Sequence, residues 1–182
     1  AVSKIHKKAK TQKNNIQIVK ALIYQSKYLQ ILEEDSQLKI IENFKSEIDS
    51  QDLVTKHVLE NLLAKLYWQY YQNNRYKFYN RSKTSEKVAT DFRTWDLETL
   101  FTEVHYYYQN SLENGLLLQQ EPLEKYSALL IELENSKTYR PTLFDFLSHN
   151  ALVFYQTTEN GITQPAYKFT IDNPELISKS DV

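Results

Sequence analysis

Residues 62–81 read LLAKLYWQYYQNNRYKFYNR, and seven of these side chains are aromatic. Here and just upstream, apolar positions recur every three or four residues, which is the spacing of a helix face. One row runs through Val54, Val58, Leu62, Leu66 and Tyr70, and a second row beside it through Leu59, Leu63 and Tyr67. The pattern predicts a long helix from about Ser50 to residues 73–74. Since a soluble helix needs only one apolar face, the extra rings indicate either an unusually aromatic core element or a surface that contacts something else.

The same helical spacing continues on both sides of this stretch. We expect further helices over about residues 2–13, 16–33, 36–48, 97–114, 122–133 and 142–155. Residues 83–90 are polar and without pattern, which predicts a loop, whereas residues 166–171 alternate weakly and predict at most one short extended segment.

Local signals predict where several of these helices begin and end. Asp96 is placed to cap the helix that follows it, and Gly115 is expected to end that helix as a left-handed cap. Pro122 is expected to open the next helix, because proline is tolerated in a first turn. Thr142 with Asp145 three residues later resembles a capping box.

The composition favours helices over sheets. The 182 residues include only 2 Gly and 4 Pro, and turns between strands draw heavily on these residues. We therefore predict an all-α fold of about seven helices in antiparallel hairpins. Residues 18–30 and 58–72 echo each other weakly, in the manner of tetratricopeptide hairpins but without their regular period. We expect one helical domain over residues 1–172 and a linker over residues 173–182.

Bulk charge and missing residue types exclude several functions. The net charge of −1 favours neither nucleic acid nor an anionic membrane surface, and no apolar run is long enough for a membrane span. Cys and Met are both absent, so we predict no disulfide and no thiolate metal site. The absence of a start Met and of a signal peptide predicts a segment of a longer, processed protein.

The first twenty residues are basic, with six lysines and no acidic residue. A basic helix can bind nucleic acid or a membrane surface, but its apolar face is thin. We expect a solvated helix that packs one narrow edge on its neighbour, near the acidic residues between Glu33 and Asp49.

No pattern of catalytic residues stands out. The four histidines, His6, His57, His105 and His149, form no HExxH motif, and no GxSxG, P-loop or GxGxxG sequence occurs. Asp145 and His149 lie one helical turn apart, which predicts at most a local pair. We therefore predict no catalytic residue, no metal ligand, no cofactor and no enzymatic activity.

The aromatic and basic residues around residues 68–95 are the one candidate interaction surface. Its members are Trp68, Tyr71, Arg75, Tyr76, Tyr79, Arg81 and Trp95. Three interpretations stay open: filling between helices of the core, a protein interface in which Tyr, Trp and Arg are enriched, and a stacking platform for sugars.

Five segments together resemble a known family. They are KIHKKAK (4–10), IVKALIYQSKYL (18–29), the stretch at 62–81, DFRTWDLETL (91–100) and YRPTLFDFLSHNALVFY (139–155). In this order and spacing they resemble the helical N-terminal region of the large bacterial alpha-2-macroglobulin-like proteins. The resemblance covers nearly the whole chain.

The resemblance implies a domain of unknown function in a modular protease inhibitor of the cell envelope. Such a protein would be exported and periplasmic or outer-membrane-associated in a Gram-negative bacterium. Relatives are implied to trap proteases, often with a Cys-containing thioester, which this Cys-free chain does not contain. The implied role is a non-catalytic scaffold that docks to the following domains of the same chain or to a protein partner. The alternative is a glycan-binding module that uses exposed aromatic and Arg side chains.

Overall fold

The computed structural model describes residues 1–78, 91–132 and 134–157. Within these ranges the chain forms helices and turns and no strand, with one isolated bridge between Pro122 and Thr142. The expected all-α fold is confirmed. The elements are α1 (Val2–Thr11), α2 (Asn15–Leu32), α3 (Ser36–Ile48), α4 (Leu53–Asn73), η1 (Arg75–Lys77), η2 (Phe92–Thr94), α5 (Leu97–Asn110), α6 (Gly115–Gln120), η3 (Leu123–Leu129), α7 (Ser136–Tyr139) and α8 (Leu143–Tyr155), where η denotes a 3₁₀ helix.

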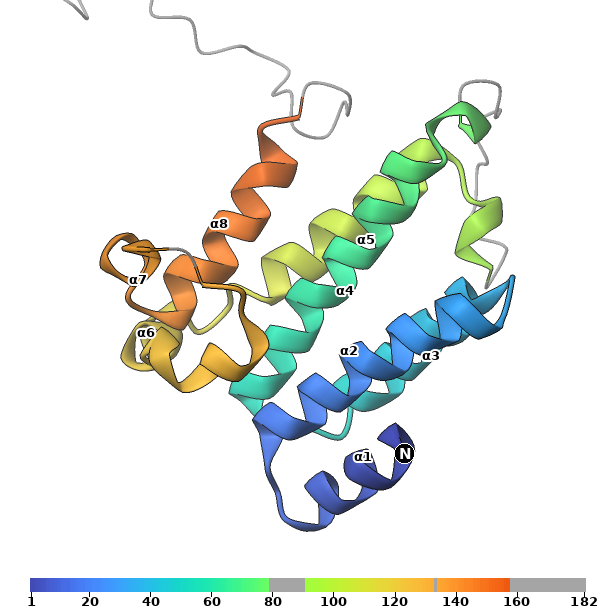
Figure 1. Ribbon diagram of the computed structural model, residues 1–182. Coiled ribbons are helices and arrows are strands. Elements are labelled where there is room, and N and C mark those ends of the chain that lie inside the picture. The colour runs from blue at the N-terminus through green and yellow to red at the C-terminus, as the bar shows by residue number, and fades with distance from the viewer. Residues whose placement is uncertain (79–90, 133, 158–182) are drawn as a thin grey trace, which may run out of the picture.

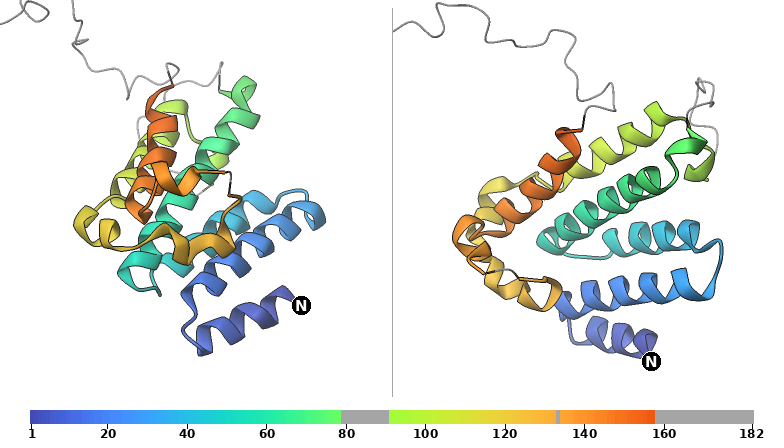
Figure 2. Two further views of the ribbon diagram at one scale, coloured as in Figure 1. Left: turned by 60° about the vertical axis from the view of Figure 1, so that its left-hand side comes forward. Right: turned by 45° about the horizontal axis from the view of Figure 1, so that its top comes forward.

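The long helices stack as antiparallel neighbours. Each of α1 to α4 packs against the next helix along the chain, and α8 packs back onto α4 (Figure 1). Figure 2 (right) shows α1 to α5 following one another across the molecule, with the segment from α6 to α7 returning across one end. Through η3 this returning segment touches α2. Helix α4 therefore has neighbours on several sides: α2, α3, α5 and α8.

The central position of α4 explains its aromatic sequence. Leu59, Leu63 and Tyr67 are buried along one row, and Val58 and Ala64 on other sides of the helix are buried as well. A helix enclosed by several neighbours needs apolar side chains around most of its circumference. Five of the six rings in residues 62–78 are therefore packed into the core, and the sixth, that of Tyr76, is exposed.

The basic α1 is held by one buried carboxylate. Glu47 of α3 is 5 % exposed, and its Oε2 lies 2.9 Å from Lys10 Nζ and 3.2 Å from His6 Nε2. Ala9 is the buried apolar residue of α1. The expected narrow packing edge and the nearby acidic partner are both confirmed.

Two of the expected helix boundaries were wrong. Gly115 does not end α5; it is the first residue of α6, and Asn114 adopts the left-handed conformation with φ 57°. Asparagine tolerates this conformation because its short polar side chain can bond locally, and Asn114 Nδ2 lies 3.3 Å from His57 Nε2.

The expected sixth helix, over about residues 122–133, is also different: residues after Pro122 form the 3₁₀ helix η3. Hydrogen bonds from Leu123 N to Pro141 O and from Leu143 N to Glu121 O tie this segment to the start of α8. The predicted cap at Asp96 and the capping box of Thr142 and Asp145 are confirmed. The predicted loop at 83–90, extended segment at 166–171 and linker at 173–182 lie outside the described residues.

Candidate functional site

The predicted interaction surface is divided between core and solvent. Trp68 is 6 %, Tyr71 5 % and Trp95 5 % exposed. Trp68 stacks on Tyr71 with ring centroids 5.3 Å apart, and Trp95 stacks on Tyr67 at 6.0 Å. These three rings cannot form an exposed platform, so the structure corrects that part of the surface to core packing.

The remaining members lie at the end of α4. Tyr76 is 68 % exposed, and Arg75 is exposed with its guanidinium carbon 5.8 Å from the centroid of the Tyr71 ring. This position is typical of a cation–π contact. Tyr79 and Arg81 lie outside the described residues. Of the seven predicted residues, Arg75 and Tyr76 alone are seen to reach solvent among those described.

Tyrosines next to Trp95 surround the ammonium group of Lys45. Lys45 Nζ lies 5.9 Å from the centroid of the Tyr67 ring, 5.8 Å from that of Tyr107, and 3.1 Å from Glu103 Oε1. Burial raises the pKa of both tyrosine hydroxyls well above the ordinary value, and the Glu103 carboxylate raises them further. The cluster joins α3, α4 and α5.

The histidines are used structurally. His57, 1 % exposed, has Nδ1 3.0 Å from Glu60 Oε2 and Nε2 3.3 Å from Asn114 Nδ2. His105 Nδ1 lies 2.7 Å from Tyr155 Oη. Each contact joins two segments of the chain or two turns of α4.

The predicted Asp145–His149 pair does not form. Asp145 accepts hydrogen bonds from Thr142 N and Oγ1, and His149 Nε2 lies 2.9 Å from Arg140 Nη2 instead. Across the described ranges there is no group of three or more His, Cys, Asp or Glu that could hold a metal ion. None of the helices described there is both long and apolar enough to cross a membrane.

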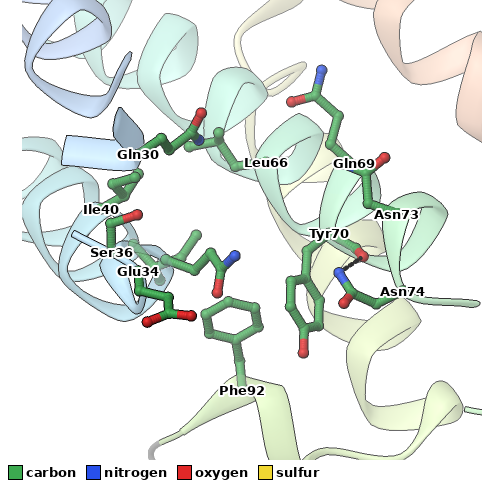
Figure 3. Close-up of a pocket in the computed structure, with 12 residues that line it drawn as sticks. Gln30, Glu34, Ser36, Ile40, Leu66, Gln69, Tyr70, Asn73, Asn74 and Phe92 are labelled. Carbon is green, nitrogen blue, oxygen red and sulfur yellow. Dashed lines mark hydrogen bonds between the residues drawn. The ribbon is translucent and has the colours of Figure 1, made fainter. Parts of the chain in front are cut away.

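A pocket of about 320 Å³ opens between the ends of α2, α3 and α4, at a place that was not predicted from the sequence (Figure 3). We call it the amide pocket. Its polar lining is Gln30, Glu34, Ser36, Gln37, Gln69, Asn73 and Asn74, and its apolar lining is Ile40, Ile41, Leu66, Tyr70 and Phe92.

Most of the carboxamides in the amide pocket are unpaired. Asn74 Nδ2 donates to Tyr70 O at 2.9 Å, the dashed line in Figure 3. The other four carboxamides of the lining form no hydrogen bond within the part of the chain that the structure describes. They belong to Gln30, Gln37, Gln69 and Asn73. These groups offer donors and acceptors to a molecule in the pocket.

An ion-pair bridge holds Phe92 at the edge of the pocket. Arg93 Nη1 lies 2.8 Å from Asp35 Oδ1, and Nη2 lies 2.8 Å from Asp91 Oδ2. The hydrogen bonds to Asp91 raise the Arg93 pKa above its ordinary value. The bridge ties η2 to the turn between α2 and α3 and so closes one side of the pocket.

A sequence signal for this pocket existed. Gln69 and Asn73 are spaced four residues apart on α4 and share one helix face, whereas Gln30 lies in the last turn of α2 and Glu34 in the turn that follows it. That these residues meet at one opening depends on how α2 and α4 pack.

No protein-family model, no curated protein and no solved structure matches this chain.

Proposed function

We propose that the chain is a non-catalytic helical interaction module that docks to a protein, either a neighbouring domain of a longer chain or a separate partner. The observation that carries the proposal is an apolar ridge on the outer side of α2. The ridge consists of Tyr24, Tyr28, Ile31 and Leu32, which are 43 %, 47 %, 70 % and 78 % exposed.

The spacing of the ridge residues indicates that they form one continuous contact face on α2. Tyr24, Tyr28 and Ile31 follow positions i, i+4 and i+7, which lie above one another on a helix. The opposite side of α2 is already occupied, because Ile18, Val19 and Leu22 are buried. Single exposed apolar residues are common on protein surfaces, whereas a contiguous row indicates an interaction site.

The rings of the ridge suit a protein partner. Tyr24 and Tyr28 lie with ring centroids 6.4 Å apart, and tyrosine is enriched in the cores of protein interfaces. The glycan-binding alternative relied on exposed rings in the predicted surface around residues 68–95. Of the rings described there, Trp68, Tyr71 and Trp95 are buried and Tyr76 alone is exposed, so no platform of several open rings forms among them. A protein partner is therefore better supported than a sugar stacked on that cluster.

We also propose that this module belongs to an alpha-2-macroglobulin-like protease trap of a Gram-negative envelope. The support is the resemblance of the five segments, of which that at 62–81 includes the C-terminal half of α4 and that at 139–155 includes all of α8. Cell fractionation tests this location separately: recovery of the protein with cytoplasmic markers would overturn the envelope placement and leave the docking proposal standing.

Site-specific photo-crosslinking tests the docking proposal. A photoreactive phenylalanine analogue replaces Tyr28 in the full-length protein expressed in its native cells. The matched control places the same group at Tyr106 of α5, which is 53 % exposed. We expect one defined adduct, intramolecular or with a partner, from position 28 and none from position 106.

A second variant strengthens the test. Combining Tyr24→Ser and Ile31→Ser with the photoreactive group at position 28 should remove most of the adduct, since the apolar contact is lost. Equal crosslinking from positions 28 and 106, or an adduct that survives the serine substitutions, would contradict docking through this ridge.

A further inference from the structure

We propose that the amide pocket binds an extended peptide segment, holding its main chain through carboxamides and one apolar side chain on the pocket floor. The proposal rests on the docking function above and names the chemistry of a segment that the partner presents. The pocket lies between the C-terminal ends of α2 and α4 and the N-terminal end of α3.

The polar lining matches a peptide main chain. A carboxamide carries both a carbonyl acceptor and an NH₂ donor, so it can pair with both the N–H and the C=O of a peptide unit. Gln69 and Asn73 of α4 face Gln30 and Glu34 of α2 and the turn after it across the opening (Figure 3). Polar groups therefore line both sides of a strand laid between the two helix ends.

The floor is apolar and already rigid. Leu66 is half-buried and so keeps apolar surface open to a bound side chain. Ile40 and Phe92 are each 2 % exposed and support the floor, with Phe92 edge-on against Tyr70 at a centroid distance of 4.8 Å. Ligand pockets commonly combine an apolar floor with a few polar groups that set orientation, in volumes of about 300–1,000 Å³. The 320 Å³ of this pocket suits one apolar side chain with its adjoining peptide units.

The charged residues at the rim of the pocket indicate which residue should stand next to the apolar one in the bound peptide. Glu33 pairs with Lys39 at 2.9 Å and Asp35 with Arg93 at 2.8 Å. Glu34, between them, is exposed and forms no ion pair within the described ranges. The lining contains no Lys or Arg. A basic residue beside the apolar one would complement this single negative charge.

The same lining disfavours a carbohydrate. Sugars bind through open faces of aromatic rings, and the two rings here, Tyr70 and Phe92, are 7 % and 2 % exposed. Tyr70 is covered further by Phe78, edge-on at 6.2 Å. A sugar in this pocket would be held by hydrogen bonds alone, without the ring stacking that offsets the cost of removing its hydration shell.

A display library of short random peptides tests the proposal. The peptides are selected on the wild-type protein and then measured against Gln69→Ala/Asn73→Ala. We expect selected sequences that share an apolar residue next to Lys or Arg. The double variant should weaken their binding by about thirtyfold, since a hydrogen bond is lost at each of the two positions. Glu34→Gln should weaken basic peptides and leave neutral ones unchanged.

The matched control is Gln72→Ala, an exposed amide on the same helix that does not line the pocket. It should bind wild-type-like. Side-chain NH₂ signals of Gln30, Gln69 and Asn73 should shift in NMR spectra on peptide addition, while that of Gln72 stays in place. Methylation of the bound peptide's main-chain nitrogens should also weaken binding.

Three outcomes would overturn the proposal: no peptide is enriched, the enriched peptides ignore Gln69→Ala/Asn73→Ala, or a neutral oligosaccharide shifts the same NH₂ signals while peptides do not. The crosslink at position 28 distinguishes the two proposals. An adduct there without peptide binding leaves docking intact and removes the peptide site. Absence of both removes the docking function itself.

Discussion

Asn61 of α4 donates a hydrogen bond from Nδ2 to the main-chain oxygen of Leu147 in α8, 3.1 Å away and 86 positions later in the chain. The same nitrogen donates to Ser111 Oγ at 3.0 Å, and Asn61 Oδ1 accepts from Asn150 Nδ2 at 2.9 Å. Asn61 is 1 % exposed and Ser111 is fully buried. One side chain therefore joins α4, the end of α5 and α8.

Asn61→Ala should lower the free energy of unfolding by about 2–4 kcal/mol. The substitution removes the donor to the buried Ser111 Oγ and Leu147 O and the acceptor of the half-buried Asn150 Nδ2, and unsatisfied buried groups cost more than the bond itself. Urea denaturation measures the change. Gln72→Ala, on the exposed side of α4, should stay within about 0.5 kcal/mol of wild type. Equal effects of the two variants would refute the role of Asn61.

Both tryptophans should be protected from solvent. Trp68 and Trp95 are 6 % and 5 % exposed, so their emission should be blue-shifted and acrylamide should quench it poorly until the protein unfolds. Trp68→Ala should destabilise the fold by about 3–5 kcal/mol, because a large core side chain is lost. Ready quenching of the native protein would show that the aromatic cluster is open after all.

Lys13→Gly should stabilise the protein by about 0.5–1 kcal/mol. Lys13 has φ 52°, and it follows α1 in a Schellman motif, with Asn14 N bonded to Ala9 O at 2.9 Å and Lys13 N to Lys10 O at 3.1 Å. Glycine adopts this conformation without the strain of a side chain. Thermal denaturation measures the change.

Lys8→Gly, inside α1 and exposed, is the matched control for that substitution. It should destabilise the protein by about 1 kcal/mol, because glycine is a poor helix former. The two glycine substitutions should thus have opposite signs. The same sign for both would mean that the left-handed conformation at position 13 carries no strain.

Stability should fall above about pH 10 as the unfolded chain releases tyrosine protons. Burial raises the pKa of Tyr67 and Tyr108, both 1 % exposed. Burial, with the Glu121 and Asp52 carboxylates, raises that of Tyr126 to about 12. Below pH 10 both states are protonated and stability is fully present. Above it the folded state alone holds these protons, so stability is lost as pH rises toward the folded pKa values.

Urea midpoints measured across this alkaline range test that loss. Each tyrosine that stays protonated should contribute a slope of about 1.4 kcal/mol per pH unit. Tyr108→Phe keeps the buried ring and removes the titrating hydroxyl, so its slope should be smaller by that amount. An unchanged slope would mean that Tyr108 ionises normally in the folded state.

The residue pattern by itself determined that this chain is helical and roughly where its helices lie. The signals for this are local, since each depends on residues close together in the chain. They are the apolar spacing of three and four residues, the scarcity of Gly and Pro, the cap at Asp96 and the capping box of Thr142 and Asp145. The left-handed position at Asn114 and the 3₁₀ form of residues 123–129 escaped prediction, because contacts with His57, Pro141 and Leu143 select them.

Tertiary structure alone decided which side chains are available to a partner. The sequence pattern does not distinguish buried aromatic side chains from exposed ones. Trp68 and Tyr71 are buried because of the helices that pack around α4. The ridge of α2 and the amide pocket arise in the same way. Helical spacing places Gln69 and Asn73 on one face of α4, but only the packing of α2, α3 and α4 brings that face to one opening with Gln30 and Glu34. Spacing along a helix is a local property, whereas exposure depends on which distant segments cover a face.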